Sequence, residues 1–265
     1  MISIIIPLYN SERYIKETLD SVLDLSIKEI EIIIVNDGST DSSISIVNEY
    51  LGKHNNISLI SKKNTGVANS RNIGLQKAKG EYVLFLDADD VLNSSFFDLK
   101  MDLINSKSNI IGSYIQVFEN NIENVIGYNH SVYQDPIKSI LKFENGVTLP
   151  SSYLFKRSFL IENNISFNTN LSSTADRFFL IQCALKDSNF KIETQNPGTL
   201  FYRVSEKSMS HNFNKKLIDD NARYVLELIK LEGIKQKLYL MKNVMSVLKS
   251  YIKLGKEYMA TVLNF

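Results

Sequence analysis

The chain is poor in the residues that mark several specialised classes of protein. It has one cysteine, Cys183, in 265 residues, which excludes an internal disulfide framework and a cluster of thiolate zinc ligands. No apolar run approaches the ~18 residues of a membrane span. The first residues lack the charged region and cleavage site of a secretion signal. We therefore expect a cytoplasmic protein.

An excess of charge of one sign is also missing. Lys and Arg number 30 and Asp and Glu number 29, giving a net charge of +1, so no global attraction to nucleic acid is expected. With only three histidines and one cysteine, the sequence argues against a hydrolase that uses a Ser/His or Cys/His pair. The 44% hydrophobic and 22% charged residues are those of an ordinary globular chain.

Two phosphate-binding motifs are absent as well. The sequence contains neither Gly-x-Gly-x-x-Gly nor Gly-x-x-x-x-Gly-Lys-Ser/Thr, which argues against a dinucleotide-binding fold and a P-loop enzyme. Any phosphate must be held by a metal ion and by scattered polar groups.

Strands and helices are expected to alternate up to about residue 90. We expect strands over residues 2–8, 31–35, 57–61 and 81–86. Helices are expected after a cap at Ser11, after the Ser39–Ser42 segment and over residues 67–78. This order predicts an α/β fold with a mostly parallel sheet covered by helices on both faces. Further along, we expect a helix over 96–106, a strand over 110–118 and a helix over 178–185.

Polar clusters follow each of the four strands. They are Tyr9-Asn10, Asp37-Gly38-Ser39, Asn64–Gly66 and Asp87–Asp90. In parallel sheets, ligands bind beyond the carboxyl ends of the strands. The sequence therefore places a binding site at this one edge.

The strongest chemical signal is the acidic segment Asp87-Ala88-Asp89-Asp90 after the fourth strand. Two carboxylates at a strand end favour a hard divalent cation, which would in turn hold a diphosphate. One alternative is that Asp90 only caps a following helix. Another is a phosphatase of the haloacid-dehalogenase type, with Asp87 as nucleophile, although that class carries its motif on the first strand.

Several motifs together resemble the family-2 inverting glycosyltransferases of GT-A fold. The resemblance rests on Ile4–Asn10, Asn36–Asp41, Asn64–Gly74 and Phe85–Asp90, and later on Ser173–Phe179, Tyr202-Arg203 and Ser208–His211. It covers about residues 1–212 and implies transfer of a sugar from a UDP-sugar to a hydroxyl of a glycan or lipid-linked saccharide. The usual setting of such compact family members is bacterial surface polysaccharide synthesis.

The resemblance also implies residue roles. Asp176 would be the catalytic base, with an N-cap role as its alternative, and Asp37 would bind the uracil ring. Mn²⁺ or Mg²⁺ would be held by Asp89, Asp87 and His211. The nucleotide-sugar site would comprise Pro7, Tyr9, Glu12, Asp37, Asn64, Arg71, Asp87 and Ala88.

The chain departs from the family pattern at two positions. Ala175 stands where the family usually has an acid, and Asn36 replaces the commoner Asp. Ala175 keeps open a non-catalytic alternative, a subunit that binds the sugar nucleotide without turnover. If Asp176 is the base, catalysis survives this change.

The expected organisation is a catalytic domain followed by a helical extension. Residues 1–212 would form the GT-A domain, with nucleotide-sugar binding over about 1–95 and the acceptor side over about 96–212. Residues 213–265 would form two helices; from Asn214 this tail has ten Lys/Arg and five acids. It could contact the inner face of a membrane, pack on the domain or form a homodimer.

Overall fold

The computed structural model describes residues 1–27, 29–130, 135–141, 148–192, 199–204 and 215–231, with isolated positions at 245, 249 and 253. The first four strands are β1 (Ile2–Leu8), β2 (Ile30–Asn36), β3 (Ile57–Ser61) and β4 (Tyr82–Phe85). The helices between them are α1 (Ile15–Leu23), α2 (Ser43–Leu51) and α3 (Val67–Lys77). The predicted alternation of strands and helices is confirmed, with boundaries shifted by a few residues.

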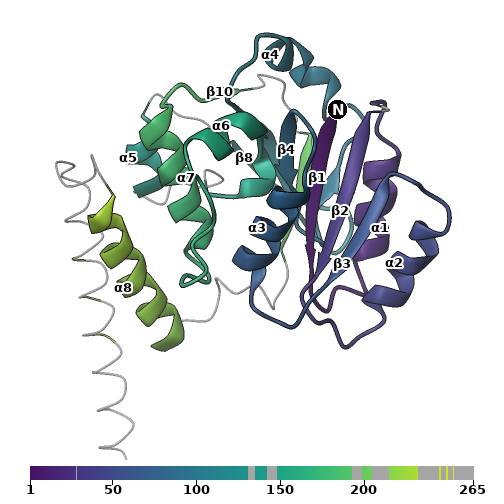
Figure 1. The fold of residues 1–265 in the computed structure, drawn as a ribbon, viewed down its shortest axis with the longest axis horizontal. Coiled ribbons are helices and arrows are strands. Elements are labelled where there is room, and N and C mark those ends of the chain that lie inside the picture. Colours follow the sequence, from purple (N-terminus) through teal and green to yellow (C-terminus); the bar gives the residue numbers. More distant parts are fainter. Residues whose placement is uncertain are drawn as a thin grey trace, which may run out of the picture.

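The main sheet has seven strands in the order β10-β6-β9-β4-β1-β2-β3. β1 pairs in parallel with both β2 and β4, and β2 pairs in parallel with β3. β9 (Tyr153–Lys156) runs antiparallel between β4 and β6 (Ile110–Gly112), and β10 (Lys191–Ile192) adds a parallel edge. Figure 1 shows the parallel part of this sheet, β4 to β3, side by side.

A second, four-stranded sheet has the order β5-β11-β7-β8. Its strands are β5 (Val91–Leu92), β11 (Leu200–Val204), β7 (Tyr114–Glu119) and β8 (Val125–His130). The single strand expected over 110–118 was therefore wrong. β6 ends before the buried Ser113, whose N–H donates to the Ser152 carbonyl at 2.8 Å. The chain then continues into β7 of the second sheet.

The remaining helices are short except for α7 and α8. They are α4 (Met101–Asn105) after a 3₁₀ turn at Asp98–Lys100, α5 (Pro136–Leu141), a 3₁₀ turn at Pro150–Ser152, α6 (Arg157–Glu162), α7 (Ala175–Lys186) and α8 (Lys215–Lys230). The helix expected over 96–106 is thus shorter than predicted. Ser11 is not the cap of α1, because that helix begins at Ile15 with Tyr14 at its N-cap.

Alternate residues of the parallel strands build two separate cores. Ile5 and Phe85 belong to a core that includes residues of α3 and α7, whereas Ile4 and Leu84 belong to one that includes residues of α1. Both faces of the sheet are therefore buried, which explains why these strands read as nearly continuous apolar runs.

α8 completes the first of these cores. Tyr224, Val225 and Leu228 of α8 are buried in the same cluster as Phe178 and Ile181 of α7, and Figure 1 shows α8 beside α7 on the side away from α1 and α2. The first helix expected in the extension is therefore present and shares a core with the preceding residues. The expected second helix lies largely outside the described residues.

In the part of the chain that the structure describes, no helix has the length and apolar character that a membrane crossing would require.

Candidate active site

The loops after the parallel strands are joined to one another by hydrogen bonds. After β1, the N–H of Asn10 donates to Ser39 Oγ at 3.1 Å, and Asn10 Oδ1 accepts from the N–H of Thr40 at 2.8 Å. Asn10 takes a left-handed conformation with φ of 48°, which asparagine tolerates better than most residues. The predicted gathering of strand-end clusters at one edge is confirmed for these loops.

Asp37, the expected uracil ligand, connects the loop after β2 to the loop after β3. Its Oδ1 accepts from the N–H of Thr65 and its Oδ2 from the N–H of Gly66, both at 2.8 Å. Lys62 forms an ion pair with the same carboxylate, which is almost fully buried. Asp37 thus orders the 62–66 loop in this structure, and its contact with a base stays a prediction.

Arg71 of α3 lies between two carboxylates that are far apart in the sequence. Its Nη1 donates to Asp176 Oδ1 at 2.5 Å and its Nη2 donates to Asp87 Oδ1 at 2.6 Å. The Arg71 side chain is 2% exposed, while those of Asp87 and Asp176 are 28% and 27% exposed. The expected base and the expected donor-site acid therefore share one buried cation and keep surface open to solvent.

The same arrangement sets the protonation of the site. Although burial disfavours its charged form, Asp176 and Asp87 raise the pKa of Arg71 above its ordinary value. Burial raises the pKa of Asp176 to about 6; Arg71 opposes this shift and the charge of Asp87 adds to it. A carboxylate with a pKa near neutrality is suited to accept a proton from a substrate.

Asp176 does not cap α7. Thr174 is at the N-cap of that helix and Asp176 lies in its first turn. The alternative of a purely capping role is therefore wrong. Ala175, which replaces the usual acid of the family, is fully buried.

The segment before α7 is held by a residue from α8. Asp220 Oδ1 accepts from the N–H of Ser172 at 2.8 Å, and its Oδ2 accepts from the N–H and the hydroxyl of Thr174 at 3.0 and 2.8 Å. Burial acts to raise the pKa of Asp220, but these hydrogen bonds lower it overall. A carboxylate from another helix thus takes the place of a local cap for the helix that carries Asp176.

The acids after β4 lie in a turn and not on an extended strand. The N–H of Asp90 donates to the carbonyl of Asp87 at 3.1 Å. Burial, together with the charge of Asp87, raises the pKa of Asp89 to about 6. Asp90 is fully buried, accepts from the N–H of Arg203 at 3.2 Å and precedes β5, so it does not cap a helix.

The carboxylates of Asp87 and Asp89 fit a divalent cation that is bound together with a diphosphate. Among the described residues no group of three His, Cys, Asp or Glu side chains could hold a metal by itself. Mg²⁺ sites commonly use one or two carboxylates and complete their ligands with substrate phosphates. Burial and, second, the charge of Asp87 disfavour the ionised form of Asp89, and a cation bound beside Asp89 would favour that form.

The other predicted residues are spread around the same edge. Pro7 and Ala88 are buried, whereas Tyr9, Glu12 and Asn64 are exposed. Glu12 is tied to the next loop, because its Oε2 accepts from the N–H of Ser42 at 2.9 Å. His211 lies outside the described residues.

Sequence reasoning missed the contacts of three residues that organise this edge: Lys62, Arg203 and Asp220. A lysine between two loops has no distinctive local pattern, and Asp220 appeared only as one of five acids in a basic tail. Arg203 did stand out as part of the Tyr202-Arg203 pair, but its partners are supplied by distant segments.

The family of the chain follows from comparison with known proteins. The model of "Glycosyl transferase family 2" matches residues 3–178, and the chain belongs to this family. It is 29% identical over 253 residues to the "Putative glycosyltransferase EpsH" of Bacillus subtilis, covering 89% of this chain and 72% of that protein. It is 33% identical over 199 residues to a "Poly(ribitol-phosphate) beta-glucosyltransferase" of Bacillus spizizenii, covering 72% of this chain but only 30% of that enzyme.

Solved structures confirm the predicted GT-A fold. The crystal structure of S. aureus TarS 1-349 in complex with UDP-GlcNAc aligns with a TM-score of 0.73 and 24% identity, covering 92% of this chain and 71% of that one. A mannosyltransferase from Pyrobaculum calidifontis, in complex with GDP-Man and Mn²⁺, aligns with a TM-score of 0.61 and 16% identity, covering 98% of this chain and 75% of that one. The phosphatase alternative is ruled out by the family and by the fold.

Proposed function

We propose that this glycosyltransferase moves a sugar from a UDP-sugar to an acceptor hydroxyl in a single displacement that inverts the anomeric centre. The observation that carries the proposal is Arg71, which brings Asp176 and Asp87 to the same buried cation. The base for the acceptor and an acid of the donor site are thereby fixed relative to each other, as a direct displacement requires.

Asp176 is the general base in this mechanism. An acceptor hydroxyl has a pKa far above neutrality, so its proton must pass to a carboxylate as attack proceeds. Arg71 holds Oδ1 of Asp176, which leaves Oδ2 to take the proton. A base held in orientation by a third group is the arrangement that activates nucleophiles in many enzymes.

Asp89 and Asp87 hold the metal ion in the proposal, with His211 as a further candidate ligand. A bound Mn²⁺ or Mg²⁺ would neutralise the negative charge that grows on the departing diphosphate. Arg71 holds Oδ1 of Asp87 in an ion pair, and the Asp87 side chain stays 28% exposed.

The loops after β1, β2 and β3 form the nucleoside side of the site. Tyr9 and Asn64 are exposed there. Asp37 bonds to the neighbours of both: its N–H donates to the Leu8 carbonyl and its Oδ1 accepts from the N–H of Thr65, each at 2.8 Å. TarS, a structural neighbour, is known in complex with UDP and with UDP-GlcNAc. This supports a uridine nucleotide as the donor's carrier here.

The acceptor that we propose is a glycan or lipid-linked saccharide of a bacterial surface polysaccharide. The names of the relatives support this setting, because two of them act on poly(ribitol-phosphate). We further propose a cytoplasmic protein in which the C-terminal extension mediates contact with the inner face of the membrane or with a second copy.

A panel of UDP-sugars tests the function directly. Purified protein is incubated with each donor, with and without Mn²⁺, and release of UDP is measured. We expect metal-dependent release with one donor or a few, its loss in Asp176→Asn, and weaker metal-dependent UDP binding in Asp89→Ala. Metal-dependent UDP binding without turnover of any donor or acceptor would instead favour a non-catalytic binding subunit.

A further inference from the structure

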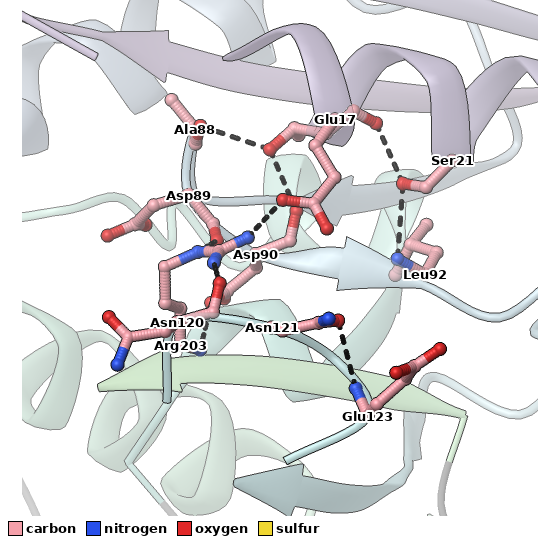
Figure 2. Close-up of polar contacts among 11 residues, drawn as sticks. Glu17, Ser21, Ala88, Asp89, Asp90, Leu92, Asn120, Asn121, Glu123 and Arg203 are labelled. Atoms are coloured by element: carbon pink, nitrogen blue, oxygen red, sulfur yellow. Dashed lines mark hydrogen bonds and ion pairs between the residues drawn. The ribbon is translucent and has the colours of Figure 1, made fainter. Parts of the chain in front are cut away.

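Arg203 of β11 is almost fully buried and contacts the acidic turn, residues Asp87–Asp90. Its Nε donates to the carbonyl of Asp89 at 2.9 Å, and its own N–H donates to Asp90 Oδ1 at 3.2 Å. Figure 2 shows the guanidinium turned toward the Asp89 carbonyl, while the Asp89 carboxylate points the other way. The arginine thus holds the backbone of the turn and leaves its carboxylate available.

The rest of the guanidinium is anchored by two other segments. Nη1 donates to the carbonyl of Asn120 at 2.9 Å, and Nη2 forms an ion pair with Glu17 of α1. The faces of the guanidinium pack on aromatic rings, with Cζ 4.4 Å from the Phe118 centroid and 4.7 Å from the Tyr14 centroid. The side chain is therefore fully engaged by the protein and is not placed to touch a substrate.

α1 supports the same turn from the other side. The Thr18 hydroxyl lies 3.0 Å from the Ala88 carbonyl and 2.8 Å from the Asp90 carbonyl, and it is the donor to both. One turn further on, Ser21 Oγ accepts from the N–H of Leu92 at 3.2 Å. As Figure 2 shows, the acidic turn lies between α1 and β11 and is attached to both.

We propose, resting on the proposed function, that Arg203 is a positioning residue of the donor site: by fixing the backbone of the Asp87–Asp90 turn it aims the Asp89 carboxylate at the cation that the donor's phosphates share. The direction of a side chain follows from the backbone that carries it. Groups that orient metal ligands commonly change metal affinity by 10- to 100-fold when they are lost, as a general order of magnitude.

Arg203→Lys is the informative substitution. Lysine keeps the positive charge and most of the volume, but its single ammonium cannot reproduce the planar fork that reaches Asp89, Asn120 and Glu17 together. The measurement is UDP binding by calorimetry, with and without Mn²⁺. We expect the affinity with Mn²⁺ to fall about tenfold and the affinity without metal to stay within about twofold.

Arg157→Lys is the matched control. Arg157 Nε also donates to a backbone carbonyl, that of Gly80 at 3.0 Å, but at the opposite end of β4. This variant should bind UDP as the wild type does under both conditions. A purely structural role for Arg203 would lower thermal stability and leave the Mn²⁺-dependent gain in UDP affinity unchanged, which would overturn the proposal.

Glu17→Gln keeps the proposal testable if Arg203→Lys does not fold. Glu17 is partly exposed, so the change removes the charge that orients the guanidinium without emptying buried space. We expect a smaller loss in the same Mn²⁺-dependent affinity, and no loss would contradict the positioning role. If the wild type binds no UDP at all, the proposed function fails; if it binds and the variants match it, only the role of Arg203 fails.

Discussion

At the scale of single residues, Arg71 links the two carboxylates of the candidate site. It is buried between Asp87 and Asp176 and keeps both carboxylates in defined positions. Removing one partner of a buried ion pair is costly because the other charge is left without compensation. The three residues therefore act as a unit, and substitutions among them should not be additive.

Asp176→Asn tests the base with the least change in shape. Asparagine keeps an oxygen for the contact with Arg71 but has no basic carboxylate to accept a proton. We expect kcat to fall by at least about 100-fold, with UDP affinity in the presence of Mn²⁺ nearly unchanged. Steady-state kinetics and calorimetry give the two values, and unchanged turnover would remove Asp176 from the mechanism.

The rate should also depend on pH through the same residue. Asp176 must be ionised to act as a base, and burial raises its pKa to about 6. Because Asp176 is about half ionised at its pKa and about nine-tenths ionised one pH unit higher, kcat should rise with pH through about 6 and level off above about pH 7. A pH–rate profile that stays flat between about pH 5 and 8 would contradict this, and residual activity of Asp176→Asn should lack the acidic limb.

At the scale of secondary structure elements, α8 supports α7. Asp220 accepts hydrogen bonds from Ser172 and Thr174 immediately before the helix that carries Asp176. An exposed tail would have no such role. The segment that leads into the Asp176 helix is thus anchored by a residue more than forty positions later in the chain.

Asp220→Ala should therefore affect both stability and catalysis. Loss of a charged acceptor for buried donors costs about 1–3 kcal/mol, and the segment before α7 would lose its anchor. We expect a lower free energy of unfolding and a lower kcat, measured by denaturant titration and steady-state kinetics. Glu227→Ala, which removes a surface ion pair with Lys230 on the same helix, should change stability by less than about 1 kcal/mol.

Some elements were accessible to sequence reasoning and others were not. The strand over residues 2–8 has the predicted bounds because a buried parallel strand is apolar along its whole length. The 110–118 segment was also apolar, but its break at Ser113 depends on a hydrogen bond to Ser152. Periodicity within a segment carries no information about which of two sheets will pair with it.

At the scale of the whole molecule, α8 shares one hydrophobic core with α7 and with strands of the main sheet. Tyr224 and Leu228 of α8 are buried at 1% and 0% exposure in the cluster that contains α7. Burying each large apolar side chain contributes about 1.5–3 kcal/mol. The boundary proposed at residue 212 therefore divides a packed region.

Truncation at two points tests this integration. A chain that ends at residue 231 keeps α8 and should retain UDP affinity and a thermal midpoint close to that of the full chain. A chain that ends at residue 212 loses Asp220 and the buried residues of α8, so it should unfold at a much lower temperature. Equal thermal midpoints for the two truncated chains would show that α8 adds no stability.

The sequence by itself determined the parallel sheet, the edge at which polar loops gather, the family and the candidate base. These features can be predicted from local patterns, because apolar runs, turn residues and acidic motifs are each contiguous in the chain. Tertiary structure alone decided that Arg71 joins Asp87 to Asp176, that Asp220 supports α7 and that Arg203 holds the acidic turn. Each of these contacts pairs a charged group with partners from distant segments, and only folding brings them within hydrogen-bond distance.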